Sequence, residues 1–158
     1  MNREAFLSDT LHHITDALQT VAGLEETEAL LASVGASMGE KIYAQECTLL
    51  KVDRLPVASL PASFDALAEG FGADFLGNDS QTTRFVMENC RCSCSRNSDT
   101  QRGYCNLMAN ILGSLAANSA GYAKVRLEKL AKHPTGCCRL VVDLEDDGTP
   151  GIEYFAHD

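Results

Sequence analysis

Hydrophobic periodicity changes along this chain, and the order of that change constrains the fold more than any other feature. The first apolar stripe consists of Leu7, Leu11, Ile14, Leu18 and Val21. Spacings of four and three residues predict a helix from about residue 3 to residue 22 with one apolar face. Alternation with a period of two, typical of strands, comes later and is clearest from Cys138 to Leu144. Helices followed by strands predict an α+β fold.

Local signals place the other elements. A second helix carries Gly35 and Gly39 one turn apart, which predicts close approach by another backbone, within the fold in preference to a dimer partner. The remaining expectations are an extended segment at 47–52, a third helix at 62–71, turns at Gly70, Gly72 and Gly77, a strand at 82–87, a helix at 101–119, strands at 122–130 and 137–144, and an edge strand at 152–155. We expect N-terminal helices packed on a mixed or antiparallel sheet, with a long helix preceding the last two strands.

Length and composition favour one soluble domain over residues 1–158, with a helical part at 1–72 and a cysteine-bearing part at 73–158. The net charge of −9 opposes nucleic acids and anionic membranes, and no apolar run is long enough for a membrane span. No apolar signal core opens the chain, so a cytoplasmic location with reduced thiols is expected. In that compartment, clustered cysteines favour metal or redox chemistry.

The seven cysteines are distributed unevenly. Three of them, Cys90, Cys92 and Cys94, alternate with polar residues, whereas Cys105, Cys137 and Cys138 follow later and Cys47 stands apart. Three chemistries fit such a cluster: a zinc site with thiolate and carboxylate ligands, an iron–sulfur cluster, or reversible thiol oxidation. Buried, inert thiols are the plain alternative, which a polar, cysteine-dense segment disfavours. Asp146 and Asp147 are expected to form a solvated turn.

Enzyme signatures are missing from the sequence. It contains no glycine-rich phosphate loop, no serine nucleophile elbow and no dinucleotide-binding fingerprint. No catalytic residue is therefore predicted, and a non-enzymatic role is favoured.

Residues 27–145 resemble the methanogen output domain family and, more distantly, the 4-vinyl-reductase-type ligand-binding domain. The likeness rests on the cysteine segment, on Tyr104-Cys105 opening a helix with Gly113, and on the motifs at 121–128 and 136–142. The resemblance implies a sensor domain that binds a small apolar molecule between helices and sheet. In phenol-sensing relatives, three cysteines and a glutamate hold zinc.

Carried over by position, the implied metal ligands are Cys105, Glu128 and Cys138. Phenol sensors have a further cysteine where this chain has Ala131, so one of the three thiols in the Cys90–Cys94 segment would complete the site. Strict alternation points Glu128 away from the face of Cys138, unless the strand twists or bulges near its end. The alternative for Glu128 is a solvated strand face beside Lys124, Arg126 and Lys129.

Taken together, these features predict a metal-binding cytoplasmic sensor domain for signal transduction. Its metal ligands would be Cys105, Cys138, Glu128 and at least one of Cys90, Cys92 and Cys94, with the part of Cys137 left open. Zinc is favoured over an iron–sulfur cluster because the carboxylate suits it. The expected partners are a signalling protein, a small apolar ligand and a second copy in a homodimer. The alternative function is an iron–sulfur or thiol redox protein, or a reductase accessory protein.

Overall fold

The computed structural model describes residues 1–78, 83–89, 102–130 and 137–157. Its α-helices are α1 (Arg3–Ala22), α2 (Leu24–Leu50), α3 (Leu60–Phe71) and α4 (Arg102–Ala120), with a short 3-10 helix at Val57–Ser59 before α3. The strands are β1 (Asp74–Asn78), β2 (Arg84–Asn89), β3 (Tyr122–Leu130), β4 (Cys137–Asp143) and β5 (Ile152–Phe155). The predicted α+β fold is confirmed.

All five strands join one antiparallel sheet in the order β1-β2-β4-β3-β5. The mixed or antiparallel sheet that the sequence predicts is thus antiparallel throughout. The tail at 152–155 forms the predicted edge strand, paired with β3. Strand β1 was not predicted, because Gly72 and Gly77 indicate turns, and Gly77 does interrupt the regular pairing of β1 with β2.

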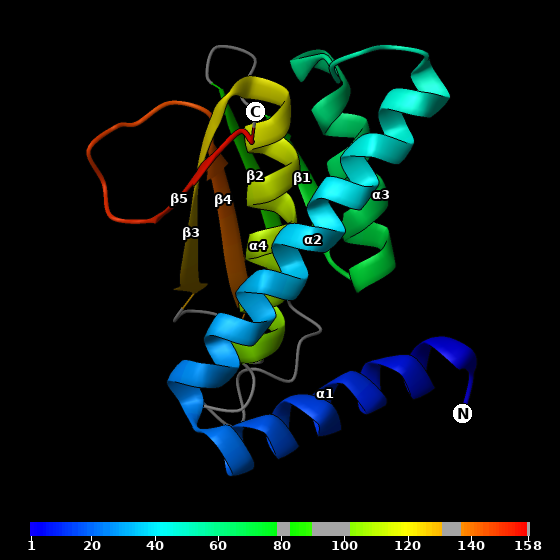
Figure 1. Cartoon of the computed structure of the whole chain (residues 1–158), viewed down its shortest axis with the longest axis vertical. Coiled ribbons are helices and arrows are strands. Elements are labelled where there is room, and N and C mark those ends of the chain that lie inside the picture. The colour runs from blue at the N-terminus through cyan, green and yellow to red at the C-terminus, as the bar shows by residue number, and fades with distance from the viewer. Residues whose placement is uncertain (79–82, 90–101, 131–136, 158) are drawn as a thin grey trace.

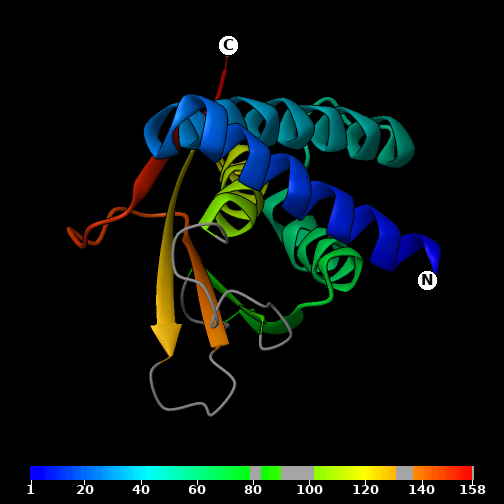
Figure 2. The same cartoon turned by 90° about the horizontal axis from the view of Figure 1, so that it is seen from below.

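The helices cover one face of the sheet in two layers. Figure 1 and Figure 2 show α4 between the sheet and α2. Helix α3 lies beside α4 and over β1, and α1 crosses one end of the molecule. The inner layer, α4, is the most buried helix, because both of its sides pack against other elements. Among the described residues, no helix has the length and apolar character required to span a bilayer.

Local residues explain where the helices begin and end. Asn2 caps α1 by accepting a 2.8 Å hydrogen bond from the backbone N–H of Ala5. Gly23 alone separates α1 from α2, and its φ of 88° lets the chain change direction in one residue. The predicted extended segment at 47–52 is wrong. Helix α2 continues to Leu50 and ends at Lys51, which adopts a left-handed conformation.

The main core lies between α4, α3 and the inner face of the sheet. Phe64 of α3 is 1% exposed, and its ring meets those of Phe85 and Phe75 edge to face, at centroid distances of 5.1 and 6.3 Å. Helix α4 contributes side chains that are entirely buried, Ile111, Leu112, Leu115 and Ala116 among them. This core fixes α4 over the middle of the sheet, and therefore fixes where the first turns of α4 reach the sheet's end.

The close approach predicted for Gly35 and Gly39 occurs between α2 and α4. A Cβ atom built on Gly39 would lie 2.6 Å from Cβ of Ser114 and 2.8 Å from the Ile111 carbonyl oxygen. One built on Gly35 would lie 2.5 Å from Cβ of Asn110. Ser114 donates a 3.1 Å hydrogen bond to the Ala36 carbonyl across this contact. The glycines therefore serve a helix crossing within the fold, as favoured from the sequence.

Candidate metal centre

Two buried thiols meet at one end of the sheet. Cys105 lies in the first turns of α4 and is 4% exposed, and Cys138 lies near the start of β4 and is 8% exposed. They form a two-residue buried cluster of their own, separate from the main core. The fold therefore brings together two cysteines that are far apart in sequence, as expected from their predicted positions on a helix start and a strand.

Two features of the surroundings of this pair act on the thiolate form in opposite directions. Free backbone N–H groups at a helix start favour negative charge, and Cys105 lies within reach of that end of α4. The thiolate is the form of cysteine that binds metals. On the neighbouring strand β2, buried Asn89 stands opposite Cys138 in the sheet register. The helix start thus favours the thiolate of Cys105, whereas burial of both thiols favours the neutral form unless a cation binds there.

The structure does not describe the side chains of the other predicted thiol ligands. Cys90, Cys92 and Cys94 lie outside the described residues, although Cys90 follows Asn89 directly in the sequence. The side chain of Cys137 is likewise outside the described set. The segment that carries the three clustered cysteines therefore begins at the end of β2, next to the strand position that bears Cys138.

Glu128 is not brought to the thiol pair. In the sheet register it stands beside Arg139, in a row that continues to Glu88, whereas Cys138 stands one residue away, opposite Lys129. Neighbouring residues of a strand point to opposite faces, so Glu128 projects from the outer face and Cys138 toward the helices. The Glu128 carboxylate lies 3.4 Å from Arg126 Nη1 and its side chain is 40% exposed. Within the described residues, no group of three or more His, Cys, Asp or Glu side chains is placed to hold a metal ion.

The outer face of the sheet, where Glu128 lies, carries a network of ion pairs instead. Asp143, whose side chain is only 7% exposed, accepts from Arg84 at 2.6 Å and from Arg126 at 3.3 Å. Arg139 donates to Glu88 through Nε and Nη2 at 3.0 and 2.6 Å. This network matches the alternative interpretation of Glu128 as a carboxylate on a charged strand face.

One lysine of this face is buried by the turn after β4. Lys124 is 2% exposed, and its ammonium group contacts Asp146 at 2.5 Å, Asp147 at 3.1 Å and the Thr149 carbonyl at 2.8 Å. Hydrogen bonding to Asp146 raises the pKa of Lys124, and the same contact lowers the pKa of Asp146. Hydrogen bonds from Thr149 lower the pKa of Asp147. The expectation of a merely solvated turn missed this contact, because nothing local in the sequence connects Lys124 to it.

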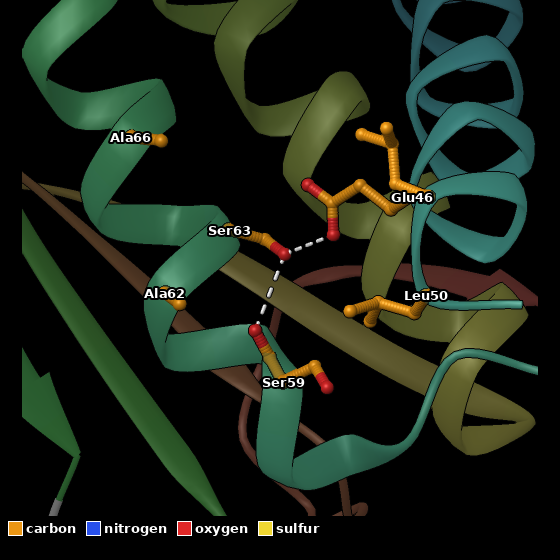
Figure 3. A pocket seen from close by; sticks show the side chains of 7 residues that line it. Glu46, Leu50, Ser59, Ala62, Ser63 and Ala66 are labelled. Atoms are coloured by element: carbon orange, nitrogen blue, oxygen red, sulfur yellow. Dashed lines mark hydrogen bonds between the residues drawn. The ribbon is translucent and has the colours of Figure 1, made fainter.

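A groove lies between two of the helices. It has a volume of about 340 Å³ and lies between the C-terminal end of α2 and α3 (Figure 3). Leu49, Leu50, Ala62 and Ala66 make its apolar walls, and the hydroxyl of Ser63 donates to the Glu46 carboxylate within it. The resemblance implies a ligand between the helices and the sheet, whereas this groove lies between two helices.

Comparison with known proteins does not assign the chain to a family. No protein-family model matches the chain, and no curated protein matches it in sequence. The site must therefore be interpreted from its own residues.

Proposed function

We propose that the protein is a metal-binding sensor domain that holds zinc through Cys105, Cys138 and at least one of Cys90, Cys92 and Cys94. The observation that carries the proposal is the separate buried cluster of Cys105 and Cys138 beside the strand end that leads into the cysteine-rich segment. Zinc prefers four donors and accepts thiolates in every position. The two buried thiols, together with thiols from the Cys90–Cys94 segment, would supply the four donors that zinc prefers.

Glu128 has no part in the proposed site. A carboxylate on the outer face, engaged with Arg126, is separated from the thiols by the sheet itself. An all-thiolate site satisfies zinc equally well, and the sequence supplies enough cysteines for one. An iron–sulfur cluster, the alternative to zinc, uses the same thiolates. The metal's identity is therefore part of the test.

Signalling would follow from where the pair lies. Cys105 belongs to α4, and α4 packs tightly on α2 through the Gly35 and Gly39 contacts. Ligand binding or thiol oxidation at the metal would alter the start of α4, and the α2–α4 contact would carry that change toward the outer helices. A partner protein could then recognise the altered surface.

Metal content after anaerobic purification, measured together with an absorption spectrum, tests the proposal. We expect a colourless protein with about one equivalent of zinc, and we expect Cys105→Ser and Cys138→Ser each to lose most of it. The matched control is Cys47→Ser. Cys47 is a buried cysteine of the main core and should leave the metal content unchanged. Glu128→Gln should also retain zinc.

Other outcomes separate the alternatives. Bound iron with a visible absorption band would replace zinc by an iron–sulfur cluster. Metal-free wild-type protein would contradict the proposed centre and favour thiol redox chemistry. The sensing role is tested by hydrogen exchange of the loaded protein with and without hydrogen peroxide. If oxidation leaves both the metal content and the exchange of α4 and α2 unchanged, redox sensing is excluded.

A further inference from the structure

Exposed apolar side chains concentrate on the first two helices. Nine of the sixteen large apolar side chains that are exposed among the described residues fall within the first 38 positions. Those on α1 are Phe6, Leu7, Ile14 and Val21, and those on α2 are Leu24, Leu30, Val34 and Met38. Single exposed apolar residues are ordinary, but a concentration of this kind marks an interaction surface.

The exposed residues of α1 follow a regular pattern. Leu7, Ile14 and Val21 are spaced by seven residues and are 54%, 51% and 86% exposed. Thr10 and Ala17 lie between them, so large and small residues alternate along one line. We call these five residues the α1 stripe. Helical repeats of three and four residues, with small side chains between large ones, allow a second helix to pack closely.

The α1 stripe is distinct from the side of α1 that meets the protein. Thr15 is 2% exposed and Leu11 and Leu18 are half-buried, which identifies the inward side. Figure 1 and Figure 2 show α1 at the edge of the molecule, with its N-terminal end projecting from the body. Four of the five stripe residues are therefore exposed in the part of the chain that the structure describes, and Thr10 is half-buried.

Charge is arranged so that the α1 stripe can meet a copy of itself. The chain has a net charge of −9, which would ordinarily repel a second copy. By the 3.6-residue repeat, however, Asp9 and Asp16 project from the opposite side of α1. The stripe itself contains no charged residue. Because the stripe is uncharged, two acidic copies can meet there without direct contact between like charges.

We propose that two copies of the chain form a homodimer by antiparallel packing of their α1 stripes around a twofold axis at Ile14. Leu7 and Val21 lie seven residues on either side of Ile14, so each Leu7 would face the partner's Val21. This arrangement is self-complementary, as a twofold contact requires. It also brings Arg3 of one copy toward the partner's Glu25 at the start of α2. A parallel arrangement would instead bring the acidic starts of both α2 helices together.

A stable dimer would have to use the exposed apolar side chains of both helices. The exposed parts of the eight apolar side chains on α1 and α2 amount to roughly 700 Å² per protomer, close to the ~800 Å² that each partner contributes to a standard interface. The α1 stripe would form the centre, and the apolar residues of α2 would flank it.

Sedimentation velocity of the full chain tests this interface. Wild-type protein should be dimeric at micromolar concentration. Ile14→Glu and Ile14→Lys should each weaken the dimer by at least ~30-fold, as expected for a central interface residue. Mixing the two variants should restore a dimer, because each glutamate would then face a lysine. A mixture of Leu7→Glu with Val21→Lys should also associate if the helices are antiparallel.

The control is Leu49→Glu, since Leu49 is 80% exposed on α2 but belongs to the groove beside α3. It should leave the dimer intact. Far-UV circular dichroism checks that each variant is folded, and Val21→Glu, at the most exposed position of the stripe, serves if Ile14→Glu unfolds. A monomeric wild-type protein, or a dimer lost with Leu49→Glu and kept with Ile14→Glu, would overturn the proposal.

Discussion

At the scale of single residues, Gly39 illustrates how little space separates α2 from α4. Any side chain there must displace the Ile111 carbonyl or Ser114, and the backbone atom cannot move without shifting a buried helix. Overpacking of this kind costs about 1–3 kcal/mol or more. We expect Gly39→Ala to lower the free energy of unfolding by at least about 1 kcal/mol, as measured by urea denaturation.

Gly70 provides the matched comparison. It also lies within a helix, but a Cβ atom built on it meets nothing within 4 Å. Alanine is the better helix former, so Gly70→Ala should raise the free energy of unfolding by about 0.5–1 kcal/mol. Equal effects at the two positions would mean that the α2–α4 contact relaxes to accept a methyl group.

Glu128 and Cys138 show at the same scale how strand register decides chemistry. Their positions in the strand pair differ by one residue, and that single step places them on opposite faces of the sheet. A one-residue change of register would reverse the conclusion. The assignment of metal ligands thus depends more on register than on the distance along the chain.

At the scale of elements, the turn between β4 and β5 depends on Lys124. Its contacts with Asp146 and Asp147 tie the turn to β3 and cover the outer face of the sheet. Gly151 is needed there as well, because a Cβ atom on it would lie 2.7 Å from Cγ of Lys124. The edge strand β5 is therefore positioned at one end by the ion pairs of a buried lysine with two partly exposed aspartates.

Acid should weaken this turn in a predictable direction. The pKa values of Asp146 and Asp147 are lowered in the folded protein, so their contribution to stability is complete above the unfolded value of ~3.9 and is lost as pH falls through the folded values. Lys124, with a raised pKa, contributes below ~10.4 and loses its contribution only at higher pH. Wild-type protein should exceed Lys124→Met in thermal denaturation midpoint at pH 6, and the difference should shrink toward pH 2.5.

Exposed Lys41, replaced by Met, is the control for loss of one positive charge. Its midpoint should follow that of the wild type at every pH. A difference between wild type and Lys124→Met that stays constant from pH 6 to pH 2.5 would contradict the assigned pairing.

Tyr154 connects strand β5 to helix α4. The ring of Tyr154 packs directly on Gly113 of α4, where a Cβ atom would collide with it, and its hydroxyl donates a 2.8 Å hydrogen bond to Asn110. Burial raises the pKa of Tyr154, so the phenol stays protonated as a donor. The edge strand thus contacts the same helix that carries Cys105.

At the scale of the whole molecule, α4 contacts most of the other elements. It packs against α2, meets β3, β4 and β5, and begins at the thiol pair. If the proposed metal is removed by a chelator, local opening should start where the metal was bound. Amide hydrogen exchange should rise at 102–106 and at 137–139 while staying slow at 111–116, where side chains are fully buried. Uniform acceleration along α4 would indicate that the metal supports the whole fold.

Sequence alone predicted the four α-helices and the strands β2 to β5 in their correct order, because hydrophobic periodicity is a local property. It also predicted the α1 boundaries and the close approach at Gly35 and Gly39, since glycines one turn apart on a helix have few other uses. It failed at 47–52, where apolar residues with few breakers fit a strand or a helix equally well. The short strand β1 was hidden by its glycine.

Only the tertiary structure decided which residues meet. Strand order and register put Cys138 beside Cys105 and Glu128 on the other face, and no spacing along the chain contains that information. The burial of Lys124 by a distant turn and the exposure of the α1 stripe likewise arise from packing between elements. Periodicity identifies which side of a helix is apolar. Whether that side is covered depends on which other elements pack against the helix in the folded structure.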